Sequence, residues 1–255
     1  MNTQQLALPT GQLVCGEYTI TYTIRWSRRA RVLSLTIGPQ TGLIVSAPME
    51  SEQEQIERFL RRHERWVLRQ LYRWAALTAL MPKRWPYGTT LPYLGKDYPV
   101  QVLEAERALV GASLEGGVLT VRTRRRPGPP GAIAGAGSIA AARRQLRRWY
   151  AEEARRWLLD RTAVLSRQLG VTWERLRVRN QRWIWGSCSA RGSLNFNYRL
   201  VMAPPDVLEY VITHELLHRR EMNHSKRFWD LMAARCPAYR DSITWLKTYG
   251  PYLTV

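Results

Sequence analysis

Two histidines spaced four residues apart, with a glutamate beside the first, most strongly constrain how this chain can fold. Residues 214–218 read H-E-L-L-H. In a helix, His214 and His218 are turned only about 40° from each other and lie about 6 Å apart along the axis, so both imidazoles leave one face. Both rings can then reach one tetrahedral ion at about 2.0–2.1 Å. The motif therefore predicts a metal site built on a helix.

The residues around this motif support a helix and give the glutamate a role. Pro205 suits the first turn of a helix, and the acidic Asp206 opposes the macrodipole there. Glu215 flanks the metal without needing to bind it, so it can take a proton from metal-bound water and deliver it to a leaving group. The alternative is a surface helix with two chance histidines, which is a poor match for a chain that contains only four.

A third ligand is expected from His224, which follows the predicted end of the helix. A catalytic zinc site uses three protein ligands and leaves one position open. Glu221, one turn past His218, and Asp230, on the next predicted helix, are rival ligands, but His224 is preferred for its ligand type and its position after a turn. Cys188 is a candidate thiol ligand, and a small buried residue is the better interpretation.

The N-terminal half combines strand-like alternation with a single long helix. The capping-box spacing of Ser51 and Glu54 predicts where this helix begins, and apolar residues recur at helical spacing as far as Trp74. Alternating apolar residues predict a strand at residues 18–26, and other short apolar stretches predict strands at 32–37 and 43–45 and at several places within 85–122.

A Pro/Gly-rich segment, R-R-R-P-G-P-P-G-A-I-A-G-A-G-S, is typical of a linker. A long amphipathic helix is predicted over residues 139–169, with Gly170 as its stop. Two strands then flank a hairpin turn at 190–192, and Ser225 is the expected N-cap of a last helix. The chain is therefore predicted as α+β, with a tail (1–16), a β-rich N-terminal part with one long helix (17–123), a linker (124–138) and a catalytic part (139–255).

The charge of the chain is strongly positive. The formal net charge is +19, from 39 Lys and Arg against 20 Asp and Glu. A field of that sign attracts nucleic acid, anionic membrane surfaces or acidic proteins, although arginine usage can also reflect the base composition of a genome. Two predicted helices carry basic stripes, over residues 58–73 and 143–156, which makes nucleic acid a candidate partner that binds without sequence preference.

The cysteines and the chain start indicate a reducing compartment. Cys15, Cys188 and Cys236 are far apart and form no C-x-x-C pair, which argues against a disulfide framework. The first residues lack the basic start and apolar core of a secretion signal. The longest uncharged stretch, residues 127–142, is too short to span a bilayer. We expect a cytoplasmic protein without a membrane segment.

The active-site segment resembles that of the YgjP-like metallopeptidases. That family's pattern has H-E-x-x-H, followed by Asn-His-Ser and Phe-Trp, and it is preceded by Trp-Gly-Ser-Cys-Ser and Ala-Pro-Pro elements. The similarity extends over about residues 18–250. The matching elements lie at residues 185–189, 203–205, 214–218, 223–225 and 228–229.

The resemblance implies a zincin-type fold, a zinc ion held by His214, His218 and His224, and Glu215 as the catalytic base. It also places the chain near the SprT-like and Spartan-like proteases, which act on proteins attached to DNA. The implied substrate is a peptide or protein. We expect the hairpin that ends at Tyr198 to lie beside the active-site helix, where its edge either holds an extended peptide by strand addition or is purely structural.

The sequence leaves two other functions open. A metal-dependent nucleotide or phosphoester hydrolase would use the arginine surplus to bind phosphates, but no P-loop and no acidic two-metal cluster is visible. A nucleic-acid-binding module with a structural zinc would close the site with a fourth protein ligand. In that case Glu215 would have no task as a base.

Overall fold

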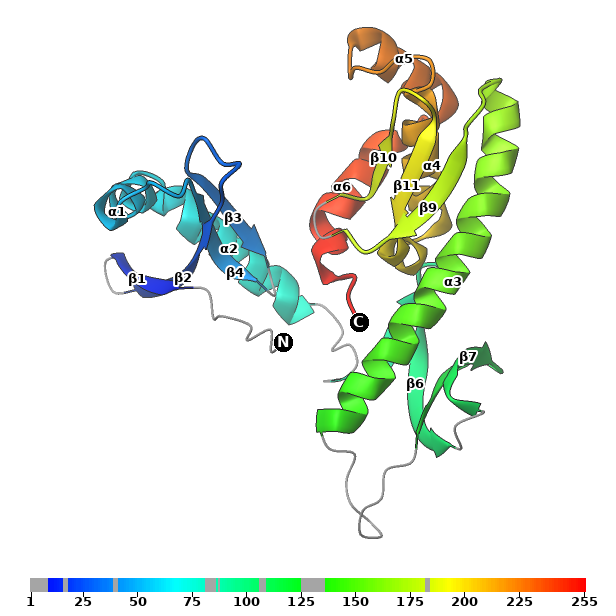
Figure 1. The fold of residues 1–255 in the computed structure, drawn as a ribbon, viewed down its shortest axis with the longest axis horizontal. Helices are drawn as coiled ribbons and strands as arrows, with labels where there is room; N and C mark the ends of the chain where they lie inside the picture. The colour runs from blue at the N-terminus through cyan, green and yellow to red at the C-terminus, as the bar shows by residue number, and fades with distance from the viewer. Residues whose placement is uncertain are drawn as a thin grey trace. The chain divides into compact units, whose positions relative to one another are not determined.

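The computed structural model describes residues 9–15, 18–38, 41–80, 86, 88–105, 109–124, 136–181 and 184–255. The chain folds into two compact units, an N-terminal unit (Met1–Met81) and a C-terminal unit (Pro82–Val255). Both contain helices and mixed sheets (Figure 1), which confirms the predicted α+β class. None of the described helices is both long and apolar enough to cross a membrane.

The N-terminal unit is a four-stranded sheet followed by two helices. Its elements are β1 (Thr10–Cys15), β2 (Tyr18–Trp26), β3 (Ser34–Gly38), β4 (Gly42–Ala47), α1 (Gln53–Arg62) and α2 (Glu64–Leu80). The strand order is β1-β2-β4-β3, and only β2 and β4 run parallel. The alternation predicted for β2 is confirmed, because Ile20, Tyr22 and Ile24 are all buried in the core of this unit.

The predicted tail differs from the structure. Thr10–Cys15 form β1, which pairs along β2 in antiparallel register. Leu13 and Cys15 alternate inward and are buried, so this segment completes the core of the N-terminal unit. Its six residues are too short a stretch for alternation to stand out from a polar terminus. Residues 1–8 lie outside the described residues.

The predicted single helix is two helices separated at His63. The His63 backbone leaves helical geometry, with φ −103° and ψ 10°. Its Nδ1 lies 2.8 Å from the Phe59 carbonyl, which the backbone N–H would bond in a continuous helix, and that N–H bonds to Leu60 instead. The first helix also begins one residue later than predicted, with Glu52 rather than Ser51 at the cap.

The C-terminal unit begins with a second four-stranded sheet and a long helix. Its strand order is β5-β6-β8-β7, and only β6 and β8 are parallel, so its topology matches that of the first sheet. Tyr150 on the helix donates a buried hydrogen bond of 2.7 Å to the Pro92 carbonyl. The elements are β5 (Thr90–Tyr93), β6 (Lys96–Ala105), β7 (Gly111–Glu115), β8 (Val118–Arg124) and α3 (Ala136–Leu169).

The rest of this unit is a three-stranded sheet with three helices. The sheet has the order β10-β11-β9; β10 and β11 form the predicted hairpin, and β9 is parallel to β11. Figure 1 shows α3 running along both sheets of the unit. The helix α6 was not predicted from the sequence. The elements are β9 (Arg175–Arg179), β10 (Gly186–Cys188), β11 (Ser193–Asn197), η2 (Tyr198–Met202), α4 (Pro205–Leu217), α5 (Lys226–Arg235), α6 (Tyr239–Tyr249) and η3 (Gly250–Tyr252).

The division of the chain differs from the one predicted at residues 124–138. The strands β5 to β8 belong to the same unit as α4, and the two units meet in sequence between Met81 and Pro82. Leu119 of β8 shares one buried core with Leu146 of α3 and with the residues of α4. Composition marks a connection in the chain, but only packing shows which elements share a core. Residues 125–135 of the predicted linker lie outside the described residues.

Candidate active site

The helix α4 carries the motif through the interior of the C-terminal unit. It begins at Pro205 with Asp206 in its first turn, as predicted, and ends at Leu217. Leu208 and Ile212 are fully buried on one side of α4, and Leu217, on the opposite side, is 1% exposed. The core therefore fixes this helix on opposite sides, and the orientation of its histidines is set by packing as well as by helical spacing.

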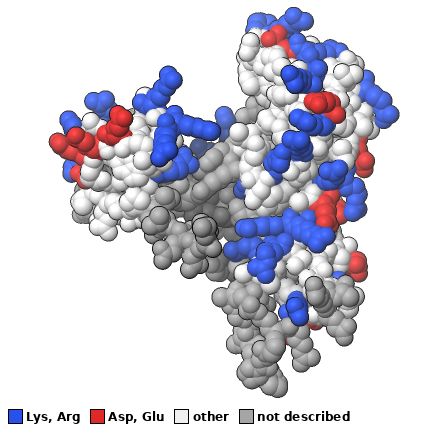
Figure 2. All heavy atoms as spheres, viewed as in Figure 1, with Lys and Arg blue, Asp and Glu red and all other residues white. Residues whose placement is uncertain are grey.

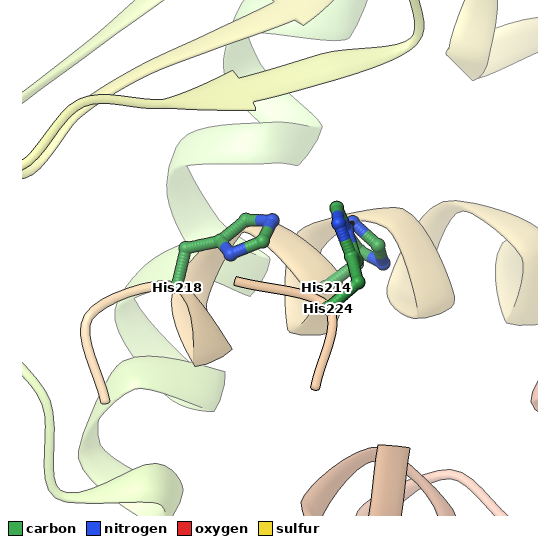
Figure 3. A group of neighbouring side chains, drawn as sticks. All are labelled: His214, His218 and His224. Carbon is green, nitrogen blue, oxygen red and sulfur yellow. Dashed lines mark hydrogen bonds between the residues drawn. The ribbon is translucent and has the colours of Figure 1, made fainter. Parts of the chain in front are cut away.

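The structure brings the three predicted ligands together (Figure 3). His214 and His218 extend from α4 and its C-terminal end, and His224 comes from the segment that precedes α5. The Nε2 atoms of His214 and His224 lie 2.9 Å apart, and the three ligand atoms all lie within 4.8 Å of one another. Ligands at about 2.0–2.1 Å from a tetrahedral ion are roughly 3.3 Å apart. The three rings therefore fit around one metal ion.

The turn after α4 orients the second and third ligands. The Nδ1 atom of His218 lies 3.1 Å from the Glu221 carbonyl, and such a contact fixes the ring so that Nε2 is left for a metal. Directly after His224, the Ser225 hydroxyl accepts a hydrogen bond from the Phe228 N–H at 3.3 Å. Ser225 is thus the N-cap of α5, as predicted, and this cap fixes the chain next to the third ligand.

An aromatic cluster surrounds the three imidazoles. The Phe228 ring centroid lies 4.8–4.9 Å from each of the three histidine rings and stacks on His218. Trp229 stacks on His224 at 5.7 Å and on Tyr239 of α6 at 5.5 Å. These contacts restrict the rings and lower the local dielectric, which strengthens electrostatic interactions in the site.

Tyr210 is a neighbour of the site that sequence reasoning missed. It lies four residues before His214, and the two rings meet edge to face at 5.9 Å. Burial, followed by the charge of Glu215, raises the pKa of Tyr210 to about 12. Its spacing was a signal in the sequence, because residues at i and i+4 share a helix face.

The environment favours neutral imidazoles, the form that binds metal. Burial lowers the pKa of His214 to about 3, with smaller contributions from the charges of His218 and His224. Burial also lowers the pKa of His218, although the Glu221 carbonyl opposes this shift. His214 and His218 are therefore uncharged at neutral pH, so a metal ion need not displace a proton from either ring.

The Glu215 carboxyl is buried against strand β10. Its residue is 5% exposed, and burial raises its pKa to about 8. At Gly186 of β10, a Cβ atom would lie only 2.6 Å from Glu215 Oε1, so the strand backbone packs directly on the carboxyl. A nearby metal cation would favour the ionised carboxylate and oppose the effect of burial. Gly186 was part of the quoted family pattern, but this contact is not visible in the sequence.

The rival ligands do not belong to the histidine group. Asp230 accepts a contact of 2.7 Å from Lys226 Nζ on the surface of α5, and Glu221 contributes its backbone carbonyl to His218. Burial raises the pKa of Cys188, and the charge of Glu215 adds to this shift. In the part of the chain that the structure describes, the three histidines are the only His/Cys/Asp/Glu group able to hold a metal.

The polar residues at the end of β11 support the sheet. Asn197 donates from its side-chain amide to the Gln181 and Ile184 carbonyls at 2.6 and 3.1 Å. The Arg199 guanidinium donates to Asn197 Oδ1 at 3.3 Å. Asn195 donates to Ser187 Oγ at 3.3 Å, between neighbouring strands. These residues therefore tie β11 to β10 and to the backbone at Gln181 and Ile184.

A helix with H-E-x-x-H and a following third histidine is the arrangement of metallopeptidases. Residues 31–249 match the family described as YgjP-like, metallopeptidase domain, and this match covers most of the chain. The chain therefore belongs to the YgjP-like metallopeptidase family, which confirms the resemblance seen in the sequence. Comparisons with curated proteins and with solved structures found no match.

Proposed function

We propose that this protein is a zinc-dependent peptidase in which His214, His218 and His224 hold the ion and Glu215 is the general base. The observation that carries the proposal is the convergence of three histidine nitrogens beside a buried carboxyl, in a chain of a metallopeptidase family. Three imidazoles are a ligand set that suits zinc. The three free cysteines of the chain agree with the reducing, cytoplasmic compartment that we expect for it.

The number of ligands supports a catalytic site. A structural zinc site is closed by four protein ligands, whereas a catalytic site keeps one position for water or substrate. Among the described residues, the group contains three ligands and no fourth. This favours the peptidase over a module in which zinc only stabilises the fold.

The roles of the protein groups follow from their positions. Bound zinc would supply a water of lowered pKa and polarise the scissile carbonyl. Glu215 would accept a proton from that water and later donate it to the leaving amine. Its burial against Gly186 holds the carboxyl in one place, and the rings of Phe228 and Trp229 restrict the histidines.

The edge of β10 supports a peptide substrate. β10 pairs with β11 on one side, and among the described strands none pairs with its other side. An extended peptide added there would form main-chain hydrogen bonds with the strand. Because Gly186 of β10 lies against Glu215, such a peptide would lie next to the proposed base. A nucleotide has no peptide backbone with which to extend the sheet at this edge.

The proposal is tested by the Glu215→Gln variant. The amide keeps the size of the side chain but cannot act as a base, so kcat should fall by about 10²–10⁴-fold, with an unchanged zinc content. The matched control is Glu221→Gln, because only the backbone of Glu221 contacts the site; it should retain activity. The assay is cleavage of a peptide library, with nucleoside triphosphates in parallel.

Two results would contradict the proposal. Near-normal peptide cleavage by Glu215→Gln would place the base elsewhere. Hydrolysis of nucleoside triphosphates without cleavage of any peptide would replace the peptidase with a phosphoester hydrolase at the same metal site.

A further inference from the structure

The outer face of the sheet β10-β11-β9 carries a row of arginines. Along β9, Leu176 is buried in the core, whereas Arg175, Arg177 and Arg179 are exposed on the opposite face. Residues i and i+2 of a strand share a face and lie about 6.6 Å apart. The three guanidinium groups therefore form a regularly spaced line along one edge of the sheet.

The neighbouring strands continue this face with small polar side chains. In the register of the sheet, Ser193 lies opposite Arg175 and Asn195 opposite Arg177, and Ser187 of β10 lies opposite Asn195. The inward positions of these strands hold the apolar residues. The outer face therefore presents arginine, serine and asparagine. We call Arg175, Arg177, Arg179, Ser187, Ser193 and Asn195 the β9 arginine face.

The positive charge of the chain is concentrated in the unit that carries this face. The C-terminal unit contains 29 of the 39 Lys and Arg and 14 of the 20 Asp and Glu, which gives +15 of the net +19. Figure 2 shows Lys and Arg side chains outnumbering acidic ones over the visible surface of this unit. A polyanion would be attracted to this unit.

The side chains of Arg177 and Arg179 have no acidic partner among the described residues, in contrast to two arginines of the basic stripe on α3. On α3, Arg148 and Arg156 form ion pairs with acidic neighbours at 2.9 and 3.0 Å. On β9, only Arg175 has a polar partner of this kind, through Ser193 and a contact of 4.0 Å with an adjacent glutamate. The backbones of Arg177 and Arg179 pair with β11, but within the described residues their guanidinium groups form no hydrogen bond or ion pair. Their charge is therefore available to a ligand.

We propose that the β9 arginine face binds the sugar-phosphate backbone of nucleic acid without reading its sequence. The guanidinium group forms bidentate hydrogen bonds with phosphate, and the repeat along β9 resembles that of successive phosphates in an extended strand. Serine and asparagine side chains add the neutral phosphate contacts that are common in such complexes.

The chemistry of the face favours nucleic acid over an acidic protein. Protein interfaces need an apolar or aromatic centre, and the six residues of the β9 arginine face include no apolar or aromatic side chain. Interfaces with nucleic acid are more polar and far more positive. The absence of aromatic rings among these six also removes base stacking, the usual source of affinity for single-stranded bases. Binding should therefore be electrostatic and independent of sequence.

The β9 arginine face lies on the opposite side of the sheet from the metal site. Gly186 and Cys188 of β10 point inward with Phe196 and Leu194 in register, whereas Ser187 between them points outward. Nucleic acid bound outside would leave Glu215 and the three histidines accessible. Binding and peptide cleavage are therefore expected to be separable by mutation.

The test is the double variant Arg177→Glu/Arg179→Glu, titrated with labelled single- and double-stranded DNA at low salt and then at increasing salt. The wild type should bind at micromolar protein, with an affinity that falls linearly in a log–log plot against salt. Each lost phosphate contact removes about 0.9 from that slope, so the variant slope should be smaller by about 2. The two DNA forms show which nucleic acid is preferred.

The matched control is Arg144→Glu/Arg155→Glu on α3, which has the same change in net charge at exposed arginines. It should keep the wild-type slope. The neutral double variant Arg177→Gln/Arg179→Gln shows whether charge reversal itself unfolds the protein. It should lower the salt slope by a similar amount, with an unchanged melting temperature. No binding of either DNA by the wild type, an equal loss of slope in the α3 control, or displacement of DNA by poly-glutamate at equal charge would overturn the proposal.

Discussion

The contact between Gly186 and Glu215 predicts that one methyl group will both destabilise and inactivate the protein. In Gly186→Ala, the new Cβ would lie 2.6 Å from Glu215 Oε1 and 2.7 Å from its Cγ, whereas ordinary contacts begin at 3.4 Å. The carboxyl and the strand must therefore separate by about 0.8 Å. Glu215 is buried, and Gly186 is fixed by its pairing with Phe196. Neither partner can move without a cost.

The size of the effect follows from this displacement. Extra volume in a packed interior costs about 1–3 kcal/mol of stability. A shift of about 1 Å in a catalytic group can lower the rate by roughly 10²-fold. We therefore expect Gly186→Ala to lose about 1–3 kcal/mol in urea unfolding and to lower kcat by roughly 10²-fold. The zinc content should be unchanged, because the histidines are not displaced.

The control is Gly111→Ala, where the added Cβ would meet nothing within 4 Å. This variant should be neutral or gain about 0.4–1 kcal/mol, because alanine reduces the freedom of the unfolded chain. The assays are urea unfolding, zinc analysis and peptide cleavage on both variants. If Gly186→Ala is as stable as Gly111→Ala, the Gly186 backbone does not pack closely on Glu215. If Gly186→Ala is destabilised but cleaves peptides at the wild-type rate, Glu215 is not the base.

Three further substitutions test the site and the fold. His218→Ala should lose the bound metal, as measured by elemental analysis of the purified protein, and full retention would contradict its role as a ligand. Ser225→Ala removes the cap of α5 next to His224 and should cost about 1 kcal/mol and weaken zinc binding, whereas Ser225→Thr should behave like the wild type. Tyr150→Phe leaves the buried Pro92 carbonyl without this hydroxyl and should cost about 1–3 kcal/mol in urea unfolding; no change would argue against the contact between α3 and β5.

The metal centre was the part of the structure most accessible from the sequence, because its spacing is local. His214 and His218 share a helix face because of helical geometry alone. Ser225 is a typical N-cap residue, so it predicts that α5 begins beside His224. The strands β2 and β4 and the helix α3 were predicted from the same kind of local periodicity.

Local patterns failed where a particular side-chain contact, rather than the periodicity, decided the outcome. The apolar spacing continues through His63, so only the bond of its ring with the Phe59 carbonyl reveals the break between α1 and α2. The Pro/Gly-rich segment suggested a boundary between domains. Yet Leu119 and Leu146 lie on opposite sides of that segment and share one core.

The sequence by itself determined the chemistry of the site: three imidazoles and a carboxyl at spacings that a helix and a capped turn convert into a metal-binding cluster. Only the tertiary structure placed Gly186 on Glu215 and turned Arg177 and Arg179 away from the core, on the face opposite the metal site. The physical reason is that helical spacing is fixed within a few residues of the chain. The packing of β10 on α4, and the face that each strand exposes, depend on side chains far apart in the sequence.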